Sequence, residues 1–411
     1  MKPRIQYAIL ATLLAANLLN YIDRQILYAV FPLIKADFNL SDTQLGLLGS
    51  AFMLSYMIFA PLLGWIGDHT RPSRLASGGL AFWSLATAMS GIAANYLTLL
   101  FSRSLVGIGE ASFGVVSPGI LSDTFDREVR GRVLSFFFLA IPVGSAIGYL
   151  LGGVLGFHFG WQKAFLLVAL PGLILSVPLW RIPCPGNKPA EHAETGKGPF
   201  SLKPYAALLR NRSYLFNALA MAAMTFALGG LAQWIPTFIY RYHNMNVLEA
   251  NTAFGAITVV SGIGGTLLGG WLGDFLQKRT SKGYFLVSAA GFFLSLPCCL
   301  LAILTTDLST CMIAVFFAEC LLFFNTGPLN TIIVNVSNPL YRATAFALNI
   351  FIIHALGDAV SPSVIGWLSD LMNLRAALLI APLFILVALI FCLCGCRFID
   401  EDMADANVAR E

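Results

Sequence analysis

The chain has 411 residues, of which 57% are hydrophobic and only 11% charged, with a mean hydropathy of +0.77. A soluble protein carries about 25% charged residues because its surface faces water, so these figures exclude a soluble globular protein. They also exclude a disordered chain, which needs low hydrophobicity and high charge. The net charge of +4 is small, and we predict an all-α membrane protein.

Twelve apolar stretches follow one another along the chain, each about as long as the roughly 20 residues that a helix needs to cross a bilayer. The first is longer than the roughly 7–15 apolar residues of a secretory signal and reaches Asp23-Arg24 without a clear cleavage site. We therefore expect it to remain as a transmembrane helix. The predicted spans are 7–31, 41–66, 75–95, 97–121, 132–156, 163–181, 213–240, 249–272, 283–304, 308–330, 344–368 and 374–396.

Basic residues lie mainly on one side of these predicted spans. With the N-terminus in the cytoplasm, nineteen Lys and Arg residues fall in cytoplasmic segments, four fall outside, and Arg24 and Arg103 lie within helices. Cytoplasmic loops of membrane proteins carry this excess, so we predict an even number of spans with both termini cytoplasmic. The four outer basic residues are Lys35, Lys163, Arg241 and Arg375.

A polar segment rich in proline, glycine and basic residues, 182–212, separates the sixth span from the seventh. It predicts a cytoplasmic linker between an amino-terminal six-helix bundle, 1–181, and a carboxy-terminal six-helix bundle with a short cytoplasmic tail, 213–411. The two halves share a motif, because Gly-Trp-Ile-Gly-Asp at 64–68 recurs as Gly-Trp-Leu-Gly-Asp at 270–274. Such duplication is typical of transporters built from two repeats around a central site.

Ionisable residues inside the spans are rare, since each costs at least about 2.5 kcal/mol at the bilayer centre unless it is paired or hydrated. Arg103 and Glu110 are seven residues apart, so they share a helix face roughly 10 Å apart in depth. Asp23 and Arg103 have similar depths and can form an ion pair, whereas Glu110 lies deeper, with no obvious cation at its level.

These groups are either structural salt bridges or functional groups. A carboxyl in a partly hydrated apolar site can exchange protons near neutral pH, so we predict proton coupling for Asp23 and Glu110. We predict substrate binding for Arg103 and Arg24, although Arg24 could instead extend toward the outer surface.

The second half contributes His354, Asp358 and Glu319. His354 and Asp358 are four residues apart and share a helix face, and histidine titrates near physiological pH. The pair is therefore a candidate for proton coupling, with a hydrogen-bonded packing role as the alternative. Glu319 stands alone in the tenth span, and we predict that it contributes to substrate binding unless it faces a packing contact.

Several catalytic and ligand-binding motifs are absent. The sequence lacks the phosphate-binding loop of nucleotide hydrolases and the H-E-x-x-H and G-x-S-x-G motifs of hydrolases. Cys392, Cys394 and Cys396 would splay around a helix, which disfavours a tetrahedral metal site. We expect no enzyme activity, no cofactor, no metal and no nucleic-acid partner.

Residues 64–68, followed by Arg71 and Arg74, resemble the loop motif of the major facilitator superfamily, and residues 103–111 resemble its fourth-helix motif. Residues 20–24, 103–112, 140–149 and 357–362 resemble the signatures of its Spinster family of lipid transporters. The family places a basic residue directly after Asp68, whereas here His69 and Thr70 precede Arg71. The resemblance implies a conformational gate motif at Gly64, Asp68, Arg71, Arg74 and Asp274.

The resemblance also implies alternating access and proton-linked movement of lysophospholipids or sphingoid phosphates. We therefore predict a proton-coupled secondary transporter of an amphiphilic lipid, acting as a monomer in the bacterial inner membrane. A proton-driven exporter of drugs or small hydrophilic metabolites is the main alternative. A lipid-modifying membrane enzyme and a non-transporting sensor are further readings.

Overall fold

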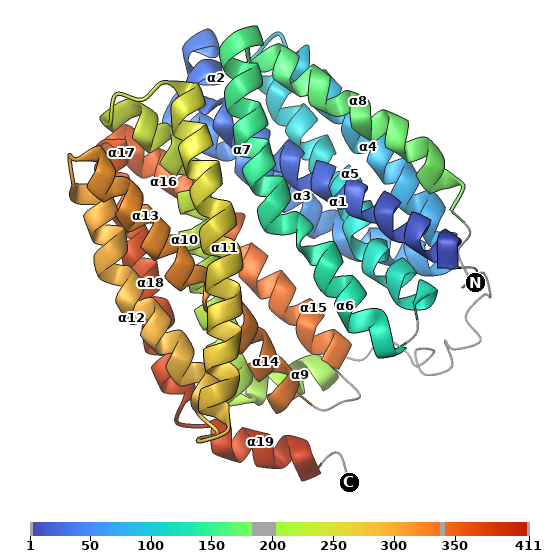
Figure 1. Ribbon diagram of the computed structural model, residues 1–411, viewed down its shortest axis with the longest axis vertical. Helices are drawn as coiled ribbons and strands as arrows, with labels where there is room; N and C mark the ends of the chain where they lie inside the picture. Colours follow the sequence, from blue (N-terminus) through green and yellow to red (C-terminus); the bar gives the residue numbers. More distant parts are fainter. Residues whose placement is uncertain (1–2, 126, 183–202, 338–341, 409–411) are drawn as a thin grey trace. The chain divides into compact units, whose positions relative to one another are not determined.

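The computed structural model describes residues 3–125, 127–182, 203–337 and 342–408 (Figure 1). Within these ranges the chain is almost entirely helical and contains no strand, which confirms the predicted all-α class. Most of the predicted linker lies outside the described residues.

The helices follow in chain order. They are α1 (Pro3–Ala29), α2 (Phe31–Phe38), α3 (Asp42–His69), α4 (Pro72–Gly91), α5 (Tyr96–Thr124), α6 (Arg127–Phe138), α7 (Ala140–Phe159), α8 (Trp161–Trp180), α9 (Lys203–Arg210), α10 (Arg212–Tyr242), α11 (Val247–Gln277), α12 (Gly283–Leu304), α13 (Leu308–Phe323), α14 (Thr326–Val336), α15 (Arg342–Ile353), η2 (His354–Asp358), α16 (Ser361–Leu371), α17 (Leu374–Leu378), α18 (Ile380–Gly395) and α19 (Ile399–Val408).

Eleven helical stretches in the described part of the chain are long and apolar enough to cross a membrane. The predicted span 75–95 corresponds to α4, which is not among them. Small residues of α4 are buried, and the neighbouring helices approach them closely. A Cβ on Gly79 would lie 2.7 Å from the carbonyl oxygen of Gly109 on α5. On the other side, a Cβ on Gly172 of α8 would lie 2.1 Å from Ser84 Oγ of α4. Close packing thus replaces the large apolar side chains of a lipid-facing helix. The count of twelve spans and their orientation stay predictions.

The helices form two compact units. The first comprises the described residues within Met1–Lys197 together with Ile239–Ala256, and the second those within Gly198–Phe238 and Ile257–Glu411. The carboxyl end of α10 and the first turns of α11 therefore belong to the first unit. There, Asn251 Nδ2 donates a hydrogen bond of 3.0 Å to the carbonyl oxygen of Ala29. The predicted division into two six-helix bundles at the linker stays a prediction.

Glycines allow α7 to approach α1 closely. A Cβ on Gly148 would lie 2.8 Å from the carbonyl oxygen of Ile22, and one on Gly152 would lie 2.5 Å from Cβ of Ala29. These residues form the smooth face expected from their four-residue spacing. The contact holds the carboxyl-terminal turns of α1, which carry Asp23 and Arg24, against α7.

Candidate functional site

The first ion pair joins α1 to α5 inside the first unit. Arg103 Nη1 lies 3.3 Å from Asp23 Oδ1, and both residues are almost completely buried. Thr87 of α4 also donates a hydrogen bond to Asp23. The rings of Phe52 and Phe165 flank the guanidinium, with centroids 5.8 and 5.7 Å from its central carbon. The Asp23–Arg103 pair that equal depth made possible is therefore present.

A second ion pair involves the next residue of α1. Arg24 Nε donates a hydrogen bond of 2.7 Å to Glu110 Oε2, and Glu110 is fully buried whereas the Arg24 side chain is 16% exposed. The sequence suggested no cation at the depth of Glu110. Arg24 supplies it because side chains tilt toward the amino end of their helix and the arginine stem is long enough to extend along it.

Glycine and aromatic residues shape the surroundings of this second pair. A Cβ on Gly107, midway between Arg103 and Glu110, would lie 2.2 Å from the carbonyl oxygen of Phe52, so α5 and α3 are in backbone contact. The rings of Phe52, Tyr21 and Tyr56 have centroids 5.0–5.3 Å from the Arg24 guanidinium carbon. Cation–π attraction therefore adds to the ion pair in holding this guanidinium.

A small polar cavity of about 100 Å³ opens beside the Arg24–Glu110 pair. Both residues line it, together with Asn17, Asn20 and Tyr56. The second carboxylate oxygen of Glu110, Oε1, is buried and has no hydrogen-bond partner among the described residues. A cavity with several polar groups can hold water, so this carboxylate has room to accept a proton or to exchange its partner.

Glu319 occupies a different environment in the second unit. It lies on α13 and is buried, and its two carboxylate oxygens accept hydrogen bonds from α11: Ser261 Oγ at 3.0 Å and Thr258 Oγ1 at 3.4 Å. No basic side chain in the described ranges pairs with it. The structure thus gives Glu319 two hydroxyl partners, and its predicted part in substrate binding stays a prediction.

His354 and Asp358 form a contact at an irregular point of the second unit. His354 Nδ1 lies 2.9 Å from Asp358 Oδ1, and both side chains are partly exposed. They belong to η2, a single turn of π-helix in which Gly357 leaves helical geometry at φ −105° and ψ −107°. π-Helical turns frequently occur at functional sites. The two side chains lie on one face, as their spacing predicts, whereas the irregular turn was not anticipated. Their role in proton coupling stays a prediction.

The residues of the predicted gate motif lie at the ends of helices. Gly64 faces open space, and Arg71 directly precedes α4 without a capping hydrogen bond from its side chain. The Arg74 guanidinium carbon lies 5.5 Å from the centroid of the Trp180 ring. Asp274 accepts a hydrogen bond of 2.8 Å from the Tyr284 hydroxyl. The side chain of Asp68 lies outside the described residues, and the gating role of the motif stays a prediction.

The sequence analysis missed one ion cluster in the first unit, formed by Asp42, Arg241 and Lys35. Arg241 donates two hydrogen bonds to the Asp42 carboxylate, Nη1–Oδ2 at 2.6 Å and Nη2–Oδ1 at 2.7 Å, and the Lys35 ammonium contacts the same carboxylate. Asp42 also begins α3. In the sequence it looked like an ordinary first-turn acid, because its partner follows 199 residues later.

We expect Asp42→Asn to destabilise the protein more than Arg241→Gln. Losing the buried carboxylate leaves Arg241 and Lys35 facing each other without a counter-charge, whereas losing Arg241 leaves Asp42 paired with Lys35. The costs should be about 2 and about 1 kcal/mol, since the arginine is partly exposed. Thermal unfolding in detergent measures both, with the exposed Lys163→Gln as control. Equal losses would contradict the unequal sharing of this carboxylate.

Comparisons with known proteins show which proteins this chain is similar to. The family model described as "Major Facilitator Superfamily" matches residues 13–362. A mouse protein named "Sphingosine-1-phosphate transporter SPNS2" is 36% identical over 97% of this chain and 78% of its own length. The zebrafish "Protein spinster homolog 3" is 34% identical over 98% and 88%.

A solved structure has the same fold. It is titled a bacterial homologue of the human lysosomal transporter Spinster in an inward-facing and unoccupied conformation, and it superimposes with a TM-score of 0.87. The sequences are 22% identical, and the match covers 98% of this chain and 99% of the other.

Proposed function

The chain belongs to the Spinster family of the Major Facilitator Superfamily, and from this premise we propose that it is a proton-coupled secondary transporter of an amphiphilic lipid. The family is one of transporters, not of enzymes, and the chain is an integral multi-pass membrane protein. The proposed substrate is a lysophospholipid or a sphingoid phosphate, in keeping with the names of the relatives. The proposed setting is a monomer in the bacterial inner membrane that works by alternating access.

The observation that carries the proposal is the Arg24–Glu110 pair beside a polar cavity. A partly buried arginine held by a single carboxylate and aromatic rings is a suitable receptor for a phosphate headgroup. Protonation of Glu110 would remove its charge and release Arg24 to bind the headgroup. Proton binding and headgroup binding would then favour each other, because linkage between two ligands is reciprocal.

The remaining predicted residues have supporting parts in this proposal. Arg103 would attract the headgroup as well, and Asp23 would compete with it for that arginine. His354 and Asp358 would carry protons in the second half, and Glu319 with its hydroxyl partners would contact substrate. The motif residues Gly64, Asp68, Arg71, Arg74 and Asp274 would control opening of the cytoplasmic side.

A flux assay tests the proposal. Purified protein in proteoliposomes should take up a labelled lysophospholipid, and an imposed pH gradient should stimulate that uptake. Excess unlabelled sphingoid phosphate should compete, whereas small polar metabolites should not. Competition by polar solutes alone would favour the exporter alternative, and chemically altered lipid after incubation would indicate an enzyme instead.

A further inference from the structure

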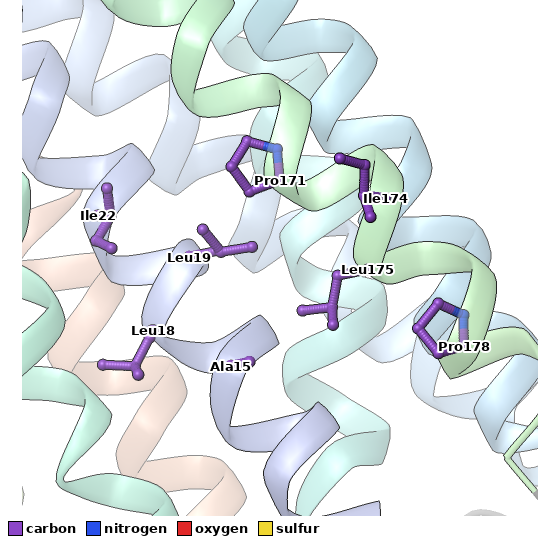
Figure 2. Close-up of a pocket in the computed structure, with 8 residues that line it drawn as sticks. All are labelled: Ala15, Leu18, Leu19, Ile22, Pro171, Ile174, Leu175 and Pro178. Atoms are coloured by element: carbon purple, nitrogen blue, oxygen red, sulfur yellow. The ribbon is translucent and has the colours of Figure 1, made fainter.

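A groove lined only by apolar side chains runs between α1 and α8 of the first unit (Figure 2). Its volume is about 570 Å³, and its walls extend from Ala15 to Ile22 on α1 and from Pro171 to Pro178 on α8. In Figure 2, Leu19 of α1 and Leu175 of α8 point into the space between the two helices. We call this space the apolar groove.

The prolines of α8 help to form the apolar groove. Pro171 and Pro178 are seven residues apart, so both rings lie on the face turned to α1. Neither has a backbone N–H, so neither can donate the helical hydrogen bond to the preceding turn. The two proline rings and the small side chain of Ala15 line the space that remains between α1 and α8.

A second hollow, of about 420 Å³, continues the apolar groove toward the N-terminus of α1 and the carboxyl end of α8. Pro178 lines both spaces, so they are neighbours along the α1–α8 face. The second hollow is also lined by Arg4 from α1 and Arg181 from α8, and both residues are exposed. Neither guanidinium forms an ion pair with a carboxylate of the described residues, so within those residues nothing neutralises the two cations that line the hollow.

The dimensions of this combined site match one leaflet of a membrane. From Pro171 to Arg181 the α8 wall extends ten residues, about 15 Å, which is half the roughly 30 Å thickness of the hydrocarbon core. The arginines lie at the end that the distribution of basic residues places in the cytoplasm, where arginine side chains extend to the level of the headgroups. An apolar groove at acyl-chain depth thus ends in two cations at headgroup depth.

We propose that this site holds one anionic phospholipid of the cytoplasmic leaflet, with its phosphate between Arg4 and Arg181 and an acyl chain in the apolar groove. Basic pockets between transmembrane helices bind anionic headgroups in this manner. This lipid is a resident of the α1–α8 face and is distinct from the transported substrate. The site therefore stands whether or not the proposed function is correct.

Native mass spectrometry of the purified, delipidated protein tests the proposal. The protein should bind phosphatidylglycerol at least about tenfold more tightly than phosphatidylcholine with the same acyl chains, because each basic residue near the headgroup adds a favourable electrostatic contribution. The double variant Arg4→Gln/Arg181→Gln should lose this preference. Arg4→Lys/Arg181→Lys should keep most of it and shows that the site tolerates substitution.

A matched control removes two exposed basic residues elsewhere. Arg210→Gln/Lys278→Gln changes the net charge equally and should keep the preference for phosphatidylglycerol. Ala15→Trp, which fills the apolar groove without changing charge, should weaken binding of both lipids. An unchanged preference in the Arg4→Gln/Arg181→Gln variant would overturn the proposal. A dimer of the unmodified protein that Ala15→Trp abolishes would also overturn the proposal, because a second copy of the chain would then occupy the apolar groove.

Discussion

Glu110→Gln should leave the protein folded while uptake ceases to respond to an imposed pH gradient. Glutamine has nearly the shape of glutamate, and its side-chain oxygen can still accept the hydrogen bond from Arg24 Nε, which now spans 2.7 Å to Glu110 Oε2. What glutamine cannot do is exchange a proton. For one coupled proton, each unit of pH difference changes the driving force by about 1.4 kcal/mol, or about tenfold in accumulation, and the variant should lose this whole response.

The measurement is uptake of labelled lysophospholipid into proteoliposomes with and without a pH gradient. Glu401→Gln is a matched control, because Glu401 is an exposed carboxylate on α19 and its loss should leave the response intact. Thermal unfolding in detergent verifies that both variants fold. If Glu110→Gln retained the wild-type pH response, Glu110 would have no part in coupling and the Arg24–Glu110 pair would be structural.

The sequence allowed the fold and part of this site to be predicted, because both follow from properties that are local to one helix. Composition and span length are sufficient for an all-α membrane protein. Helical spacing alone predicts the contact between His354 and Asp358, now observed at 2.9 Å. Equal depth in two predicted spans likewise made the Asp23–Arg103 pair available, and the two side chains are 3.3 Å apart.

Contacts that depend on how helices pack could not be derived in the same way. Arg24 reaches Glu110 only because α1 and α5 cross at a spacing that the flexible arginine stem can bridge. Asp42 contacts Arg241 because the end of α10 packs within the first unit. The spacing of residues along a single helix does not indicate which other helix it will contact. The apolar groove likewise depends on how α8 packs against α1, and single-helix patterns contain no information about that packing.

The Asp23–Arg103 pair should separate structural from functional effects more sharply than any other contact in the first unit. Arg103→Gln should destabilise the protein by about 3–5 kcal/mol, because it leaves the Asp23 carboxylate buried without its cation. In Asp23→Asn/Arg103→Gln no charge remains, and Thr87 can still hydrogen-bond to the side chain at position 23. We therefore expect this double variant to recover most of the lost stability, as measured by thermal unfolding in detergent.

Transport by the stable double variant then decides the role of the pair. A purely structural pair can be neutralised without loss of uptake, since it neither binds substrate nor exchanges a proton. A pair that binds the headgroup and exchanges a proton cannot be neutralised without loss of uptake. Asparagine and glutamine do not titrate, and they do not attract a phosphate as a cation does. We expect the double variant to be folded and inactive in lysophospholipid uptake. Wild-type uptake by this variant would instead assign Asp23 and Arg103 to helix packing alone and leave Arg24 as the headgroup-binding cation of the first unit.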